Sequence, residues 1–374
     1  MNGPRFRVDH VGSLLRPRAL AEARSRLLAE GQLHGGEALR AAEDTAIRSA
    51  VEMQAEVGLP VATDGEFRRS FWHYDFLDGL DGFRVVHRPR VSGAAFAGAL
   101  AIKPFHPTIC GRLGFPADHP MLDHFRFLAS ITDTTPKISI PGPSTTHFRT
   151  AAADIAPTAY RDLDVLLADV ADTYRAAVAA FHAAGCRYLQ LDDIFFAYLC
   201  DEEQRAAKRA EGFDPDELIE RYADTLEAAI ADRPDDMTIA MHLCRGNFRS
   251  SHAASGGYDP AADAVFNRTS VDVYYLEFDT DRAGGLEPLR LLPKGDKRVM
   301  LGLVTTKTAP LESVDDLRRG LEDAAGFVDL DQLGLAPQCG FASTEEGNLL
   351  TEAEQRAKLE RVVAAADAVW GPGV

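Results

Sequence analysis

The sequence predicts an α/β fold of the (β/α)₈ type, the TIM barrel, with an elaborated loop after the second strand. Short apolar runs alternate with helix-like segments, which is the pattern of a parallel α/β architecture. Polar residues of unusual type also fall where these runs end, as they do at the catalytic rim of a barrel. The expected strands are residues 8–15, 61–63, 137–141, 187–192, 237–244, 271–277, 298–304 and 335–339.

Helical segments are predicted between these runs, and several have recognisable boundaries. Pro17 opens the first helix, and a longer one over 37–57 carries an apolar stripe at helical spacing. Gly185 ends the long helix expected over 157–184. Further helices are expected over 202–209, 214–232, 314–325 and 352–370.

The segment from Arg68 to about Gly114 has neither a helical nor a strand period. Seven aromatic residues are scattered through it among Gly, Arg and His. A long loop after an early barrel strand usually lies over the catalytic mouth. The simpler alternative, which we prefer for most of these aromatics, is that they pack the insertion onto the barrel.

Length and composition limit the class of protein. A chain of 374 residues suits one barrel with extensions, and no linker or repeat divides it, so residues 1–374 are expected to form a single domain. Lys and Arg number 40 against 57 Asp and Glu, a net charge of −17, which argues against a nucleic-acid or anionic-membrane partner. Five cysteines and no apolar leader or spanning run favour a cytoplasmic protein. Whether the chain forms a homo-oligomer is left open.

The stretch around His242 and Cys244 carries the clearest chemical signal. The two residues lie two positions apart after an apolar run, so in a strand their side chains face the same way. Glu277 and Cys339 each end another strand-like run. Imidazole, thiolate and carboxylate are zinc ligands, so His242, Cys244, Glu277 and Cys339 form a candidate Zn²⁺ site. The alternative is a set of buried structural cysteines and a solvated strand-end glutamate.

These residues and several other motifs resemble the cobalamin-independent methionine synthase family, in the same order and at similar separations. The further segments are Val11-Gly12-Ser13, Asp64-Gly65-Glu66, Gly142-Pro143-Ser144-Thr145 and Gln190-Leu191-Asp192-Asp193. Together the motifs run from residue 11 to residue 340, nearly the whole chain. The resemblance is to a single-barrel member that corresponds to the catalytic domain of the family.

The resemblance implies a zinc-dependent methyltransferase that methylates homocysteine to methionine. A zinc with two thiolates, an imidazole and a carboxylate is a weak Lewis acid, but it can hold a substrate thiol as a nucleophilic thiolate. The implied methyl donor is 5-methyltetrahydrofolate or another methyl carrier. Glu66 and Asp192 match residues that hold the amino acid, and Ser13 matches a loop serine whose backbone binds its carboxylate. The simpler alternatives are that Glu66 is a charged residue at the rim and that Asp192 caps a helix.

Two departures from the family concern the donor. The family has a catalytic histidine after the seventh strand, whereas this chain has Thr305-Thr306-Lys307-Thr308. The family's pterin-stacking tryptophan is replaced within Thr146-His147-Phe148-Arg149. The chain also has room for only one of the two barrels of the full-length enzyme. Lys307 and Thr308 are therefore the candidate catalytic residues for protonating the leaving group.

Two other functions remain open from the sequence. One is a related zinc enzyme that opens an epoxide with the thiol of coenzyme M, and the other is a non-catalytic zinc- or thiol-binding homologue. Glu66 and Asp192 favour an amino-acid thiol, because its ammonium offsets carboxylates that a sulfonate would repel. Arg68, Arg69 or Arg245 would change this balance by pointing into the site.

Overall fold

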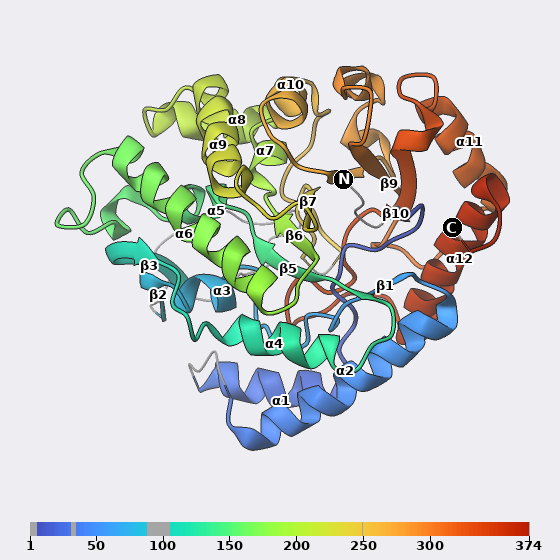
Figure 1. The fold of residues 1–374 in the computed structure, drawn as a ribbon, viewed down its shortest axis with the longest axis horizontal. Coiled ribbons are helices and arrows are strands. Elements are labelled where there is room, and N and C mark those ends of the chain that lie inside the picture. Colours follow the sequence, from blue (N-terminus) through green and yellow to red (C-terminus); the bar gives the residue numbers. More distant parts are fainter. Residues whose placement is uncertain (1–5, 31–34, 88–104, 249, 374) are drawn as a thin grey trace.

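The computed structural model describes residues 6–30, 35–87, 105–248 and 250–373. Six parallel strands form its central sheet, in the order β10-β9-β8-β7-β6-β5. They are β5 (Ile138–Pro141), β6 (Tyr188–Asp192), β7 (Thr238–Leu243), β8 (Val273–Glu277), β9 (Arg298–Val304) and β10 (Leu333–Pro337). Figure 1 shows these strands in the middle of the molecule with helices around them.

Two further runs lie beside this sheet, one near each of its edges. β1 (Val61–Ala62) pairs in parallel with β4 (Thr135–Pro136), which leads directly into β5. The first predicted strand is reduced to one bridge between Val8 and Leu335 of β10. The N–H of Leu14 then donates to the carbonyl of Gly65, 3.0 Å away, so this first run lies between β10 and the turn after β1. The eight runs thus follow the order of a (β/α)₈ barrel, which confirms the predicted fold class.

The helices cover the outside of this barrel, and most begin where the sequence indicates. The twelve α-helices among the described residues are α1 (Arg18–Ala29), α2 (Glu37–Val57), α3 (Tyr74–Asp78), α4 (Pro120–Ala129), α5 (Ser144–Phe148), α6 (Leu163–Ala183), α7 (Phe195–Tyr198), α8 (Glu202–Ala210), α9 (Pro215–Ile230), α10 (Asp259–Asn267), α11 (Val314–Ala324) and α12 (Glu352–Trp370). α6 starts later than predicted because the Asp162 carboxylate caps it by accepting from the N–H of Asp164. None of these helices is both long and apolar enough to cross a bilayer.

The predicted insertion contains α3, a short helix, and an antiparallel hairpin of β2 (Asp81–His87) and β3 (Phe105–Gly114). Residues 88–104, between these two strands in the sequence, lie outside the described residues, so that part of the predicted insertion is not described. Phe71 and Tyr74 stack on each other at 4.7 Å between ring centroids, and both are buried. These two aromatics pack the insertion, as the simpler interpretation expected, and Phe71 also lines a pocket at the carboxyl ends of the strands.

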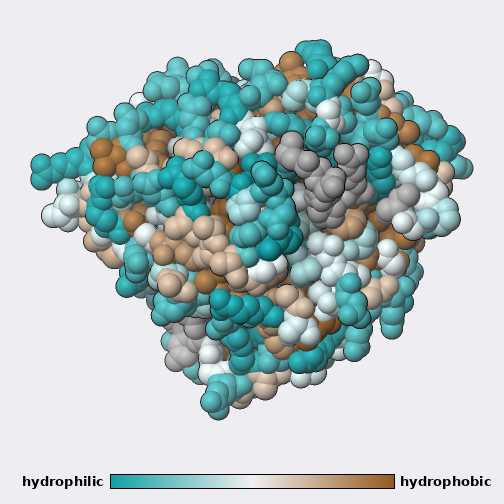
Figure 2. All heavy atoms as spheres, in the orientation of Figure 1, coloured by the Kyte–Doolittle hydropathy of each residue, from teal (hydrophilic) through white to brown (hydrophobic). Residues whose placement is uncertain are grey.

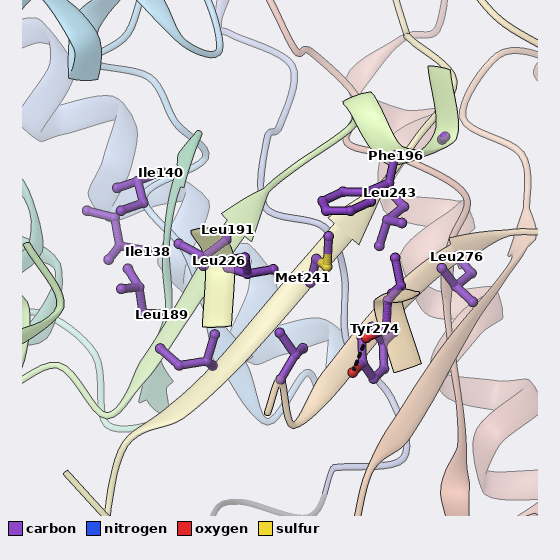
Figure 3. Close-up of a cluster of buried hydrophobic side chains, with 14 of the residues drawn as sticks. Ile138, Ile140, Leu189, Leu191, Phe196, Leu226, Met241, Leu243, Tyr274 and Leu276 are labelled. Atoms are coloured by element: carbon purple, nitrogen blue, oxygen red, sulfur yellow. Dashed lines mark hydrogen bonds between the residues drawn. The ribbon is translucent and has the colours of Figure 1, made fainter. Parts of the chain in front are cut away.

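Alternation along the strands separates the hydrophobic core from the inside of the barrel. Outward side chains such as Ile140, Leu191 and Met241 form the core between sheet and helices, as Figure 3 shows. Residues of the opposite parity therefore face inward, and at the carboxyl ends of the strands they include Asp192, His242 and Glu277. The outer surface is mainly hydrophilic in Figure 2, in keeping with the net charge.

Candidate active site

Three of the predicted metal ligands come together at the carboxyl ends of the strands. His242 is in β7, Cys244 follows it, and Cys339 lies two residues beyond β10. One ligand atom from each lies within 4.8 Å of the others, and all three side chains are buried. Two soft sulfur atoms and an imidazole nitrogen at this separation fit the ligand preferences of Zn²⁺.

The orientation of His242 supports metal binding through Nε2. Its Nδ1 lies 3.3 Å from Oδ1 of Asp192, directly opposite in the register between β6 and β7. A carboxylate accepts, so Nδ1 carries the proton of the neutral ring and Nε2 keeps its lone pair. Among the described residues Nε2 has no hydrogen-bond partner, although it is buried. A ligand histidine held by a carboxylate has this arrangement.

The three groups also influence one another's protonation. The hydrogen bond from the Cys244 thiol lowers the pKa of Cys339 well below its ordinary value, and it raises that of Cys244. Burial lowers the pKa of His242, but the nearby Asp192 carboxylate and Cys339 sulfur outweigh this effect and raise it to about 10. Of the two sulfur atoms, Cys339 is therefore the one that the site favours as a thiolate, and metal binding would release protons from the group.

Glu277, the fourth predicted ligand, lies beside this group at the end of β8. Among the described residues, its carboxylate oxygens are not part of the cluster in which all ligand atoms lie within 4.8 Å of one another. Its carboxylate is fully buried and accepts from Nε2 of Gln338. Nη1 of Arg282 and Nη1 of Arg245 lie 3.3 and 3.7 Å from Oε2. Burial raises the pKa of Glu277, but the Lys307 ammonium, Arg282 and Arg245 outweigh it and keep the pKa low. Glu277 is thus an ionised group held next to the cysteines.

The three predicted substrate-binding residues line one pocket together with His242 and Cys244. Ser13 joins the first loop to the loop after Cys339, because its carbonyl accepts from Phe341 and its Oγ from the N–H of Ala342. Glu66 has a left-handed backbone, with φ of 59°, that turns its side chain into the site. Burial raises the pKa of Glu66 to about 8 despite its ion pair with Arg69.

The turn after β9 contains both candidate catalytic residues, in different surroundings. Nζ of Lys307 is buried and has no hydrogen-bond partner among the described residues. Its charge acts on both Glu277 and Cys339, so the ammonium lies close to the ligand group. Thr308 is exposed, whereas Thr306 is buried with its Oγ1 3.0 Å from Oε1 of Gln338.

Of the arginines whose direction the sequence left open, one points into the pocket. Arg69 lines it, with Nη1 3.8 Å from Oδ2 of Asp192. Arg68 instead pairs with Glu43 and Asp44, and Arg245 lies behind Glu277. A further pocket residue, Arg149, was not predicted. The sequence feature that could have pointed to Arg149 is the stretch after Gly142-Pro143, where a tryptophan of the family is replaced.

Comparisons with known proteins identify the family of this chain. Residues 9–368 match the family model described as the catalytic domain of cobalamin-independent synthases. The uncharacterized Bacillus subtilis protein YxjH is 46% identical over 98% of this chain and 95% of its own length.

Two solved structures share the architecture. A Listeria monocytogenes protein, solved as a candidate vitamin-B12-independent methionine synthase, is 36% identical, with a TM-score of 0.76 over 99% of this chain and 100% of that one. A B12-independent methionine synthase from Shewanella sp. W3-18-1, in complex with selenomethionine, superposes with a TM-score of 0.73 at 22% identity, over 98% of each chain. From its sequence and its fold, this chain belongs to the cobalamin-independent methionine synthase family of methyltransferases, as a catalytic-domain member.

Proposed function

We propose that this chain is a zinc-dependent methyltransferase that converts homocysteine to methionine, with 5-methyltetrahydrofolate or another methyl carrier as donor. The observation that carries the proposal is the buried group of His242, Cys244 and Cys339 in a pocket that also contains Glu66 and Asp192. This arrangement joins a thiol-activating centre to groups suited to an amino acid.

His242, Cys244 and Cys339 would hold the zinc, with Glu277 as the fourth ligand after release from Arg282. Bound there, zinc would keep the substrate thiol in its nucleophilic thiolate form at neutral pH. Asp192 fixes the His242 ring, and Gln338 with Arg245 holds Glu277 within reach of the ligand group. A fourth ligand that is also held by protein groups can give way to an incoming thiol.

The acceptor is assigned from the charges that line the pocket. Glu66 and Asp192 are suited to an ammonium group, and Ser13 lies on the loop expected to meet the carboxylate. Arg69 lies between the two carboxylates and offsets part of their charge. A thiol with both an ammonium and a carboxylate satisfies groups of both signs, whereas coenzyme M carries a sulfonate and no ammonium.

In the proposed reaction the acceptor sulfur forms a bond to the methyl carbon while the bond from that carbon to its carrier breaks. The electron pair of the broken bond stays on the carrier, and an amine carrier then needs a proton. Lys307 is proposed to supply this proton, and Thr308 is proposed to assist. The Lys307 ammonium is buried close to the ligand group and has no hydrogen-bond partner among the described residues.

The test is to incubate purified protein with homocysteine and deuteriomethyl donors and to follow labelled methionine by mass spectrometry. Elemental analysis of protein prepared without added metal should give about one zinc per chain. Labelled methionine that depends on zinc supports the proposal. Zinc well below one per chain, or coenzyme M that binds more tightly than homocysteine in calorimetry, contradicts it.

A further inference from the structure

We propose that Arg149 adds a charged contact to the carboxylate of the amino-acid substrate, beside the loop of Ser13 that is expected to meet it. The inference rests on the proposed acceptor and adds a specificity-determining residue to it. It also assigns a role to a position where this chain departs from the family to which it belongs.

The backbone and an aromatic stack hold Arg149 in place. It caps the C-terminus of α5, where its N–H donates to the carbonyl of Thr145, 3.1 Å away. Its guanidinium carbon lies 5.5 Å from the ring centroid of Phe195, which stacks on Phe148 at 4.1 Å. A guanidinium held on an aromatic face loses little freedom when it binds an anion.

The charge of Arg149 is not matched by any described residue. The guanidinium forms no hydrogen bond or ion pair with the described part of the chain, and its Nε is buried without a partner. The other cations around it are matched: Arg69 pairs with Glu66, and Lys208 donates to Oε2 of Glu211 at 2.7 Å. A half-buried cation of this kind is stabilised by an anionic ligand.

The residues that line the pocket indicate that the anion bound by Arg149 is the carboxylate of the acceptor amino acid. Arg149 lines the same pocket as Ser13, Glu66, Asp192 and His242. Asp192 presents negative charge to an ammonium beside the Glu66 carboxyl, and Arg149 presents positive charge in the same pocket. An α-amino acid carries both groups on one carbon, so a single ligand can satisfy both sides.

Arg149 also lines a neighbouring cleft with Phe148, Lys208 and Phe213. A different role follows from this position, the binding of an acidic group on a second ligand in that cleft. The experiment must therefore separate a carboxylate on the acceptor from an anion bound next door.

Calorimetry on metal-free protein with three thioethers makes this separation without relying on zinc. Methionine carries both charged groups, 3-(methylthio)propylamine lacks the carboxylate, and 4-(methylthio)butanoate lacks the ammonium. Arg149→Met should weaken methionine and the butanoate by about 10–100-fold, the scale of a hydrogen bond to a charged group, and leave the amine unchanged. Arg149→Lys should restore part of the loss. Arg161→Met is the matched control, because Arg161 lines only the neighbouring cleft and is exposed.

Asp192→Asn should give the reciprocal pattern, weakening methionine and the amine but not the butanoate. Equal weakening of all three ligands by Arg149→Met indicates a structural effect and overturns the inference. Unchanged binding of methionine to Arg149→Met also overturns it and points to the neighbouring cleft. If the wild-type protein binds none of the three thioethers, the proposed acceptor fails together with the inference.

Discussion

Two clusters of polar side chains are buried inside the barrel, and they differ in whether their polar atoms find partners. The first, which we call the interior plug, comprises Asp9, Lys137, Tyr188 and Tyr275 and lies nearer the amino ends of the strands. Nζ of Lys137 donates to Oδ1 of Asp9 at 3.0 Å and to the Tyr275 hydroxyl at 2.9 Å. Both tyrosine hydroxyls donate to Oδ2 of Asp9.

The second cluster, at the carboxyl ends, leaves several buried atoms without a hydrogen bond to the described residues. They include Nε2 of His242, Oε1 of Glu66, Nε of Arg149 and Nζ of Lys307. An unpaired buried polar atom costs about 1–3 kcal/mol, so a protein keeps such atoms where a ligand will satisfy them. In these two clusters, the completed network indicates a structural role and the incomplete one indicates a binding site.

The largest expected effect is on metal binding in the second cluster. Cys244→Ser combined with Cys339→Ser should weaken zinc binding by roughly 5 kcal/mol or more, since thiolates dominate the affinity of such sites. The stability of the metal-free protein in urea should change by less than about 1 kcal/mol, because functional groups rarely serve stability. Zinc content and urea denaturation measure the two effects.

Cys110→Ser is the control for this pair, because Cys110 is an exposed free cysteine. Full retention of zinc by the double variant would remove the metal site from the proposal. A large loss of stability without metal would break the contrast between the clusters.

The interior plug should respond in the opposite way. Lys137→Met leaves the Asp9 carboxylate buried without its cation, which should lower the free energy of unfolding by about 3–5 kcal/mol. The folded fraction should still bind one zinc per chain. Lys294→Met, at an exposed lysine, should change stability little. Adding Asp9→Asn to Lys137→Met should recover part of the lost free energy of unfolding. If Lys137→Met is as stable as the wild-type protein, the interior plug contributes nothing to stability.

The sequence predicted that His242, Cys244 and Cys339 come together because their residue types are distinctive at the ends of strands. His242 and Cys244 follow one run at a spacing of two, and Cys339 ends another, so fold class and chemistry supported each other. Helices with clear caps were also predictable. α12 begins with a capping box of Thr351 and Glu354 and matches its expected range.

The stretch that contains Arg149 differs visibly from the family, but the unmatched charge of Arg149 could not be predicted from the sequence. Its role depends on having no acidic neighbour, and that is a property of several loops together. The same holds for Glu277, whose residue type suggests a ligand but whose carboxylate is shared among Gln338, Arg245 and Arg282. The first strand was overestimated for a related reason, because only Val8 pairs with β10 while the following residues turn toward Gly65.

The turn after β9 offers a kinetic test of the unsatisfied cluster. If Lys307 protonates the leaving group, Lys307→Met should lower the turnover number by at least roughly 100-fold, the lower end for general acid catalysis. Thr308→Ala should have a smaller effect, because this hydroxyl is exposed. Zinc content and the affinity for methionine should not change in either variant. Near-normal turnover of both variants would assign the proton to another group.

The smallest expected effect concerns His10, which lies beside the interior plug. Its Nε2 is 2.9 Å from Oε1 of Gln54, and Nε2 of Gln54 already donates to the carbonyls of Ala50 and Thr63. Oε1 of Gln54 is therefore an acceptor, so Nε2 of the neutral His10 ring must carry the proton. Burial and the charge of Lys137 lower the pKa of His10 to about 4, although Asp9 and Gln54 oppose this shift.

Because the folded pKa lies below the ordinary value of 6.5, the unfolded chain binds a proton first as the pH falls. The contribution of His10 to stability is complete above pH ~6.5 and declines as the pH falls toward 4. Between pH ~7.5 and ~5.5 the free energy of unfolding should fall by about 1 kcal/mol on this account. His10→Gln cannot take up this proton. Its free energy of unfolding, measured in urea, should therefore fall by about 1 kcal/mol less than that of the wild-type protein over the same pH range. If the free energy of unfolding changes with pH in the same way for the wild-type protein and His10→Gln, the interior plug tolerates a charged imidazole. That outcome would remove the distinction between a completed network and an incomplete one.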